Sequence, residues 1–250
     1  GKVKVEYNGS VTAKFVGLQP ELMSLDEWCD AMEMARLNDG KKLADDQWLQ
    51  YIALARQNKG HYINVANSGN PFPSSFQGLY DFVFFDTDWE DIMWRTAAST
   101  SHELSVSGGS AKNTYRISGR YLYDGSNLKW GKNHSQRINL RFNDKLNFSS
   151  RFSLESNIAY YVNDVVSPTQ IAQALTAGMQ QPGFPASTID GKPYAWGNWG
   201  TPNWRCELGG ENQLKSWGIN IGETFRYVFN EYWDAVATMG YNHSSAIRDI

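Results

Sequence analysis

The chain has 250 residues, enough for one large domain, and a formal net charge of −3. This acidic balance argues against a nucleic-acid partner, which would need a basic face. No apolar run approaches the roughly 20 residues of a membrane-spanning helix, and the mean hydropathy of −0.51 resembles that of a water-soluble protein. The average does not exclude membrane strands, because strands that alternate apolar and polar residues carry only a weak hydropathy signal.

Strand-like runs recur along the whole chain. In the first, Val3, Val5 and Tyr7 alternate with Lys4 and Glu6. The runs cover residues 2–16, 100–109, 113–124, 134–147, 149–163, 216–229 and 232–247. Alternation with a period of two residues predicts long strands whose two faces meet different media.

The connections between these runs alternate in length. The tight turns are residues 109–112, 147–149 and 230–231, and the long connections are residues 17–99, 125–133 and 164–215. A soluble sandwich has no reason to sort its loops in this way, whereas a transmembrane β-barrel has short periplasmic turns and long external loops. We therefore predict an all-β fold, a segment of about seven antiparallel strands of a large transmembrane barrel, whose first strand runs outward. A large antiparallel sheet with one wet face is the alternative.

One acidic residue interrupts the apolar face of the run 216–229. Glu223 shares that face with Trp217, Ile219 and Phe225. A charge that faces the middle of a bilayer is costly, so we expect Glu223 either above the bilayer or at a bulge. Aromatic residues near the strand ends, such as Tyr121, resemble the girdles of a membrane barrel.

The first long connection contains a small helical insert. Ser24 and Glu27 form a capping box, which predicts a helix that continues to about Asn38, and a second helix is expected over roughly 46–57. A lid or a partner-docking element is one interpretation. The alternative is two helices that pack against each other on a loop.

The order of residues around the second and third strands resembles that of a known family. Gly108-Gly109-Ser110, residues 113–122 (NTYRISGRYL) and Asp124-Gly125 resemble the early barrel hairpin of SusC/RagA-type TonB-dependent outer-membrane transporters of Bacteroidetes. Residues 87–91 (TDWED) with Arg95, and residues 102–107 (HELSVS), resemble the stretch that precedes it. Residues 1–7 resemble the point where the plug of that family passes into the first barrel strand.

This resemblance implies a barrel of about 22 strands with a plugged lumen, of which residues 1–250 would be the N-terminal part of the barrel. It implies a cell outer membrane location, contact with outer-membrane lipid, and no nucleic-acid partner. It also implies import of a glycan or peptide that a SusD-like surface lipoprotein captures. Energy would come from the TonB complex, through N-terminal regions absent from this chain.

The function that we expect is oligosaccharide import. A peptide importer of the RagA kind is the alternative within the same fold. A soluble β-rich carbohydrate-binding module is the alternative from another class.

Two groups of residues are candidates for contact with a substrate. The first group is the aromatic residues of the last long connection, Trp196, Trp199 and Trp204. They can stack on sugar rings, and their alternative role is contact with a neighbouring loop or the lid. The polar strand faces are expected to line the lumen, and their alternative role is to solvate the wall and pair with the plug. These lumen-facing residues are Arg116, Arg120, Arg137, Asn139, Arg141, Glu155 and Asn157.

The sequence contains no recognisable catalytic or metal-binding motif. Its histidines lack the spacing of metal ligands, and Cys29 and Cys206 lie in no C-x-x-C pair. Nucleophile-elbow and phosphate-loop motifs are missing as well. We therefore expect no enzymatic activity, no metal and no cofactor. The two cysteines are expected to be unpaired thiols, with a disulfide as the alternative.

Overall fold

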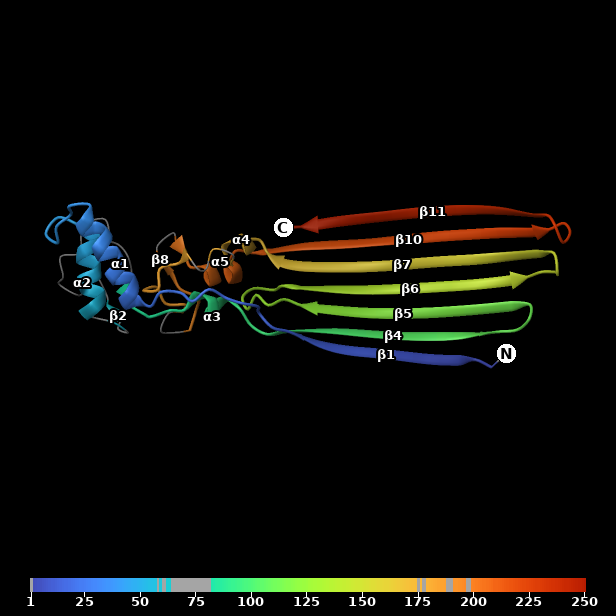
Figure 1. Cartoon of the computed structure of the whole chain (residues 1–250), viewed down its shortest axis with the longest axis horizontal. Coiled ribbons are helices and arrows are strands. Elements are labelled where there is room, and N and C mark those ends of the chain that lie inside the picture. Colours follow the sequence, from blue (N-terminus) through green and yellow to red (C-terminus); the bar gives the residue numbers. More distant parts are fainter. Residues whose placement is uncertain are drawn as a thin grey trace.

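The computed structural model of the chain describes residues 2–57, 59, 62–63, 82–174, 176, 179–187, 191–196 and 199–250. The predicted connection 17–99 and the predicted loop 164–215 fall partly outside these residues. Within the described part, seven strands form one antiparallel sheet, and neighbours in the sheet follow one another in chain order (Figure 1). Four further short strands form two separate two-stranded sheets. The seven strands of the large sheet are β1 (Lys4–Lys14), β4 (Ala97–Gly109), β5 (Asn113–Gly125), β6 (His134–Asn147), β7 (Phe152–Pro168), β10 (Glu211–Val228) and β11 (Asp234–Asp249).

The predicted alternation of connections is confirmed. All tight turns lie at the end of the sheet that also holds the N-terminus, and the long connections lie at the opposite end (Figure 1). The turns span residues 110–112, 148–151 and 229–233, slightly more than predicted. In each turn one polar side chain, that of Ser110, Ser149 or Asn230, accepts hydrogen bonds from the backbone N–H groups two and three residues later. These short polar residues therefore close the turns locally.

The strands pair in continuous register, so each predicted polar and apolar face extends across the whole sheet. One row of cross-strand partners carries only apolar and aromatic side chains; it consists of Val5, Val106, Ile117, Phe142, Ile158, Ile221 and Tyr241. The adjacent row contains Glu223. Its pairing is continuous on both sides, so the expectation of a bulge there is wrong, and its carboxylate accepts a hydrogen bond from Ser156 at 2.6 Å.

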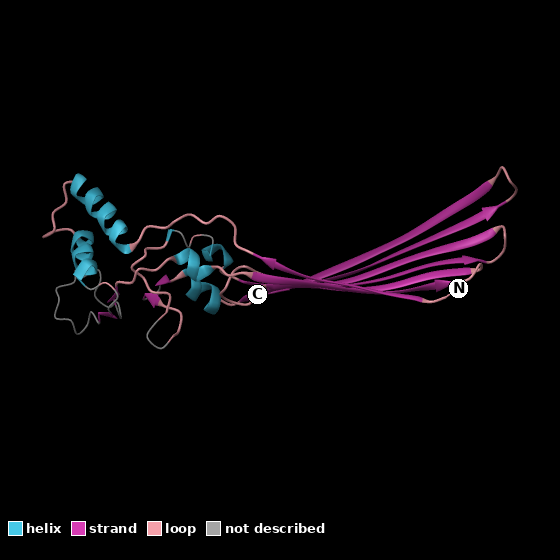
Figure 2. Cartoon of the chain, turned by 60° about the horizontal axis from the view of Figure 1, so that its bottom comes forward, coloured by secondary structure: helices cyan, strands magenta, loops and turns pink. Residues whose placement is uncertain are grey.

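Strand length and twist are those of a long, strongly coiled sheet. β1 has 11 residues and β10 has 18, and the strands fan apart toward the tight-turn end (Figure 2). β7 and β10 stay paired as far as Pro168 and Glu211. The connection between them is therefore 169–210, shorter than the predicted 164–215. None of the described helices is both long and apolar enough to cross a membrane.

The helical insert folds as a hairpin with its own small core. α1 (Leu25–Asn38) begins at the predicted capping box of Ser24 and Glu27, and α2 (Gln47–Gln57) begins after Asp46. The side chain of Asp46 accepts hydrogen bonds from the backbone N–H groups of Trp48 and Leu49, both at 3.0 Å, and pairs with Arg36. The alternative of two helices that pack together is confirmed. We call its core the hairpin cluster: Leu25, Cys29, Tyr51, Ile52, Ala55 and Phe84.

A second core joins the three long connections. α3 (Trp89–Met93), α4 (Ile171–Ala174) and α5 (Pro202–Leu208) lie near the end of the sheet, closer to it than the helical hairpin (Figures 1 and 2). We call this core the loop cluster; it consists of Trp89, Met93, Leu128 and Cys206. The tryptophan-rich loop contributes Cys206 to this core, and its Phe184 packs against it, although the loop has few aliphatic residues.

Three short contacts connect the first and last of these connections. The backbone N–H of Phe85 donates to the carbonyl of Gly183, and that of Thr87 to the carbonyl of Pro182, each at 3.0 Å. The indole N–H of Trp89 donates to the carbonyl of Gln181 at 3.1 Å. The short strands β2 (Tyr62–Ile63), β3 (Phe82–Val83), β8 (Ala195–Trp196) and β9 (Trp199–Gly200) form two small hairpins in the same region.

The two cysteines are buried thiols in separate clusters. Burial raises the pKa of the Cys29 thiol to about 11. Because the folded state holds this proton more tightly than the unfolded chain, the neutral thiol stabilises the fold fully below pH of about 8.5, and its contribution declines as the pH rises toward 11.

We therefore expect slow alkylation of Cys29 by iodoacetamide at pH 8.5, with a steep rise in rate above pH 10. Mass spectrometry of peptides after timed alkylation separates Cys29 from Cys206. A Cys29 rate equal to that of the denatured chain at pH 8.5 would contradict a buried, protonated thiol.

Candidate functional site

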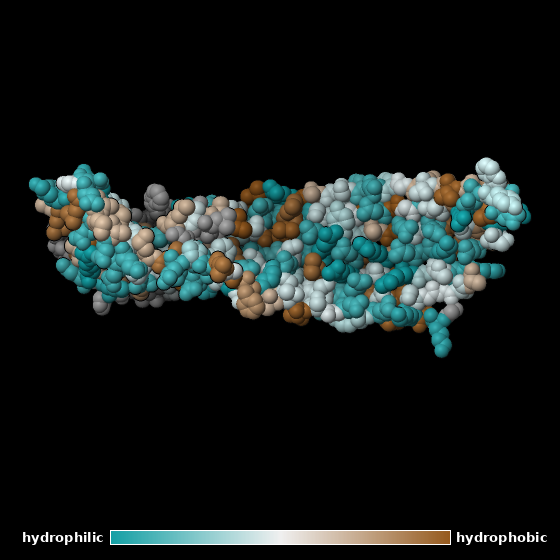
Figure 3. Space-filling model, viewed as in Figure 1, coloured by the Kyte–Doolittle hydropathy of each residue, from teal (hydrophilic) through white to brown (hydrophobic). Residues whose placement is uncertain are grey.

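All seven strand residues that the sequence assigned to a lumenal wall lie on one face of the sheet. Cross-strand partners point to the same side, and the register joins Ser118 to Arg141, Arg120 to Asn139, and Asn143 to both Arg116 and Asn157. The remaining two members are Glu155, which is paired with Lys145, and Arg137, which is paired with Leu122 and Asn163. In the view of Figure 3 hydrophilic side chains gather over the middle of the sheet, and hydrophobic ones lie mainly along its margins.

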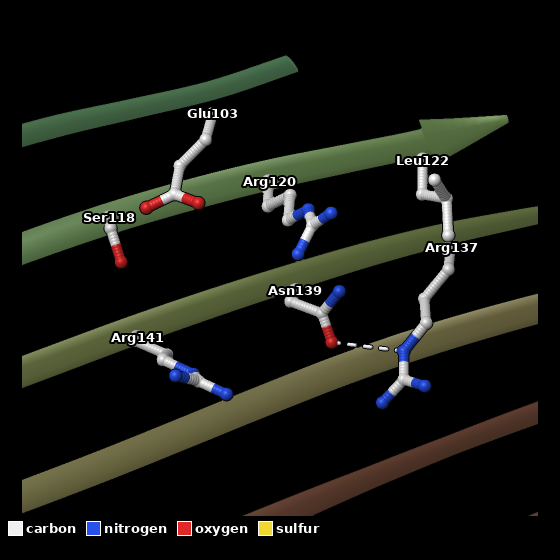
Figure 4. Close-up of a pocket in the computed structure, with 7 residues that line it drawn as sticks. All are labelled: Glu103, Ser118, Arg120, Leu122, Arg137, Asn139 and Arg141. Atoms are coloured by element: carbon white, nitrogen blue, oxygen red, sulfur yellow. Dashed lines mark hydrogen bonds between the residues drawn. The ribbon is translucent and has the colours of Figure 1, made fainter. Parts of the chain in front are cut away.

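The centre of this polar face carries three guanidinium groups close together. Arg120 on β5 faces Asn139 on β6, and Arg137 and Arg141 lie two residues to either side of Asn139 (Figure 4). Antiparallel pairing therefore brings Arg137 and Arg141 into diagonal positions relative to Arg120. We call these three residues the arginine cluster.

The arginine cluster surrounds a cavity of about 310 Å³. Besides the cluster and Asn139 its walls include Glu103, Ser118 and Leu122, which the sequence did not single out (Figure 4). Glu103 is the register partner of Arg120, but the two form no ion pair among the described residues. A sequence shows that Glu103 is on the polar face of its own strand, and only the register shows what it faces.

Protein contacts hold two of the arginines by one nitrogen each. The Nε of Arg137 donates to Asn139 Oδ1 at 3.0 Å, and the Nε of Arg120 donates to Ser101 Oγ at 3.0 Å. Arg137 also stacks over the ring of Tyr161, with 5.3 Å between guanidinium carbon and ring centroid. Within the described part of the chain, the terminal amino groups of both arginines keep no protein acceptor.

Tyr161 lies on the polar face, where its register partners are Asn139 and Gly218. Its ring covers Gly218 on the neighbouring strand, where a Cβ atom would lie 2.6 Å from the ring. Glycine at this position thus lets the tyrosine lie flat beneath Arg137.

We expect Gly218→Ala to lower the free energy of unfolding by about 1–3 kcal/mol through overpacking, because the Tyr161 ring must move and Arg137 loses its support. Gly222→Ala is the matched control. It lies on the same strand and face, and its added Cβ would meet nothing nearer than a carbonyl oxygen at 3.9 Å. Denaturant midpoints of the two variants measure the difference, and equal midpoints would contradict the proposed packing.

The remaining polar-face candidates form a second group with paired charges. Arg116, Glu155 and Asn157 line a neighbouring cavity of about 340 Å³. Glu155 pairs with Lys145 at 2.5 Å, and Arg116 donates to Ser105 Oγ at 3.3 Å. This group is electrostatically satisfied, in contrast to the arginine cluster.

The three candidate tryptophans lie near one another in the last long connection. Trp196 and Trp199 are backbone partners in the β8–β9 hairpin, and Trp204 lies in α5. Trp204 is half-buried, and its ring leaves no room for a Cβ at Gly200. Its ring therefore packs against the β8–β9 hairpin and is only partly open to a substrate.

Among the described residues no group of three or more His, Cys, Asp and Glu side chains is arranged to hold a metal ion.

Comparison with solved structures identifies the fold. A chain from the structure of the RagAB peptide transporter aligns with 98% of this chain, with a TM-score of 0.71 and 14% sequence identity. A chain from the RagAB peptide importer in its closed-closed state aligns with 98%, with a TM-score of 0.67 and 15% identity. The present chain spans 28% of the length of each. The fold is that of a segment of a large β-barrel.

Both of these neighbours are transporters, and at this level of identity the likeness concerns the fold. No protein-family model matches the chain, and no curated protein matches it.

Proposed function

We propose that the chain forms part of the wall of a TonB-dependent outer-membrane importer of oligosaccharides. The observation that carries this proposal is the sheet itself. It has one mainly apolar face with a row of only apolar and aromatic side chains, one polar face, tight turns at one end and long connections at the other. A membrane barrel that encloses a polar lumen needs these four features together.

The aromatic residues of the apolar face support this arrangement. Trp217 and Tyr227 lie on that face of β10, ten residues apart. At about 3.3 Å per residue and a tilt of about 40° their separation corresponds to a height of roughly 25 Å, the thickness of the apolar band of a membrane barrel. Glu223 would then lie inside this band and not above it, with its carboxylate hydrogen-bonded to Ser156. The tight turns would then face the periplasm, and the two clusters would lie outside the cell.

The partners follow from the same arrangement. The outer-membrane lipid would cover the apolar face. The external clusters would be the docking region for a SusD-like surface lipoprotein. Coupling to the TonB complex, and a plug that fills the lumen, would require segments outside these 250 residues. Trp196, Trp199 and Trp204 would contact sugar rings at the external mouth.

A peptide importer is the second candidate, because the two solved structures compared above are of a peptide transporter. A soluble carbohydrate-binding module has less support. Its apolar side chains would have to be covered, yet Val5, Leu140 and Tyr241 on one face are each at least 50% exposed. Monomeric soluble proteins rarely expose apolar areas of that extent.

Cell fractionation and uptake test the proposal. The complete protein that contains this chain is expected in outer membranes, and its deletion should abolish uptake of either labelled oligosaccharides or labelled peptides. Replacing the three tryptophans with alanine should weaken sugar uptake in particular. A soluble product of about 28 kDa would contradict the proposal.

A further inference from the structure

The charges of the polar face are unevenly compensated. Lys14 pairs with Asp124 at 2.7 Å, and Arg226 pairs with Asp234 at 2.7 Å. In the described part of the chain the arginine cluster has no carboxylate partner, although Arg137 and Arg141 each lie only two register positions from Arg120. Like charges in such positions repel each other, so the cluster lowers stability unless an anion joins it.

The cavity beside the cluster presents mostly hydrogen-bond donors. Arg120 and Arg137 are each anchored through Nε, and among the described residues their terminal amino groups have no protein acceptor. Arg141 makes no hydrogen bond or ion pair among the described residues. The side-chain oxygen of Asn139 accepts a hydrogen bond from Arg137, so its amide N–H groups can donate to a ligand. Ser118, the register partner of Arg141, adds a hydroxyl to the lining.

A set of this kind matches a ligand that only accepts hydrogen bonds. Guanidinium groups bind carboxylates through pairs of parallel hydrogen bonds, and such charge-assisted bonds are stronger than neutral ones. The hydroxyl groups of a neutral sugar also accept hydrogen bonds, but they carry no negative charge to offset three guanidinium groups.

We propose that the arginine cluster is a subsite for a carboxylate of the transported substrate. This inference rests on the proposed importer function and narrows it to acidic substrates, either uronate-containing oligosaccharides or acidic peptides. Glu103 at the rim would repel the ligand on one side and so orient its carboxylate toward Arg137 and Arg141 (Figure 4).

Binding to the complete protein, purified from outer membranes in detergent, tests the subsite. The probes are trigalacturonate and neutral galactotriose, and an amidated glutamate-rich peptide and its glutamine counterpart. Titration calorimetry should give one acidic probe a Kd at least about tenfold lower than that of its neutral counterpart. The acidic probe that binds identifies which of the two substrate classes supplies the carboxylate.

Arg120→Gln with Arg141→Gln should remove this preference and leave the Kd of the neutral probe unchanged. Arg226→Gln is the control on the same face and should keep the preference. If the double variant fails to assemble, Arg141→Gln alone serves, because no described protein contact depends on that side chain.

Two outcomes would overturn the subsite. The first is that neither acidic probe binds more tightly than its neutral counterpart, or that neither binds at all. This is the result expected if the cluster instead pairs with an acidic segment elsewhere in the protein. The other is an equal loss in Arg226→Gln. A membrane protein that imports only neutral substrates would refute the subsite and leave the importer standing, whereas a soluble protein would refute the importer itself.

Discussion

Replacing Ile221 with arginine should strongly reduce the amount of protein that assembles in the outer membrane. Ile221 lies in the row of cross-strand partners that carries only apolar and aromatic side chains. If that face meets lipid, an arginine near the middle of the bilayer costs about 2–4 kcal/mol. Heat-modifiable protein in washed outer membranes measures the assembled fraction.

The neighbouring residue provides the control. Asn220 lies on the opposite face, where its partners are Ala159 and Asn242, so Asn220→Arg should assemble almost as well as the parent protein. Similar losses in both variants would mean that the two faces meet the same medium. If the protein were instead a soluble sheet with a single wet face, Asn220→Arg would still fold. The amount of folded protein would then not depend on a membrane for either variant.

Trp89→Ala should have the largest effect on the external region. The Trp89 side chain is fully buried in the loop cluster, and its indole N–H donates to Gln181. Truncation of a buried tryptophan costs about 3–5 kcal/mol. Since all three long connections contribute to this cluster, we expect them to become sensitive to limited proteolysis together, while the paired strands remain protected.

Met179→Ala is the control, because Met179 lies in the last long connection, two residues before Gln181, and is 87% exposed. It should leave the proteolysis pattern unchanged. Cleavage confined to one connection in Trp89→Ala would show that the connections fold separately, and loss of the sheet would show that the strands depend on them.

Local patterns in the sequence were sufficient to predict the strands, their antiparallel arrangement and the first helix. Alternation with a period of two residues does not depend on what a strand pairs with, and the turns of Ser110, Ser149 and Asn230 close through contacts within three residues. The capping box of Ser24 and Glu27 is equally local. These features were therefore predictable.

The short helices and the loop cluster were not predictable in the same way. α3 has five residues and α5 has seven, too few for a helical period to emerge. Their stability comes from the burial of Trp89 and Cys206 against residues far away in the chain. The composition of that loop therefore suggested exposure where the fold produces a core.

For the candidate site, too, the sequence determined one part and the tertiary structure the other. The alternation in sequence by itself determined that the arginines share a polar face with Asn139, because parity along a strand fixes the side of each residue. Only the tertiary structure decided which of them meet. The pairing of β5 with β6 brings Arg120 beside Arg137 and Arg141, and the pairing of β4 with β5 adds Glu103. Register is a relation between strands, and so no single strand encodes it.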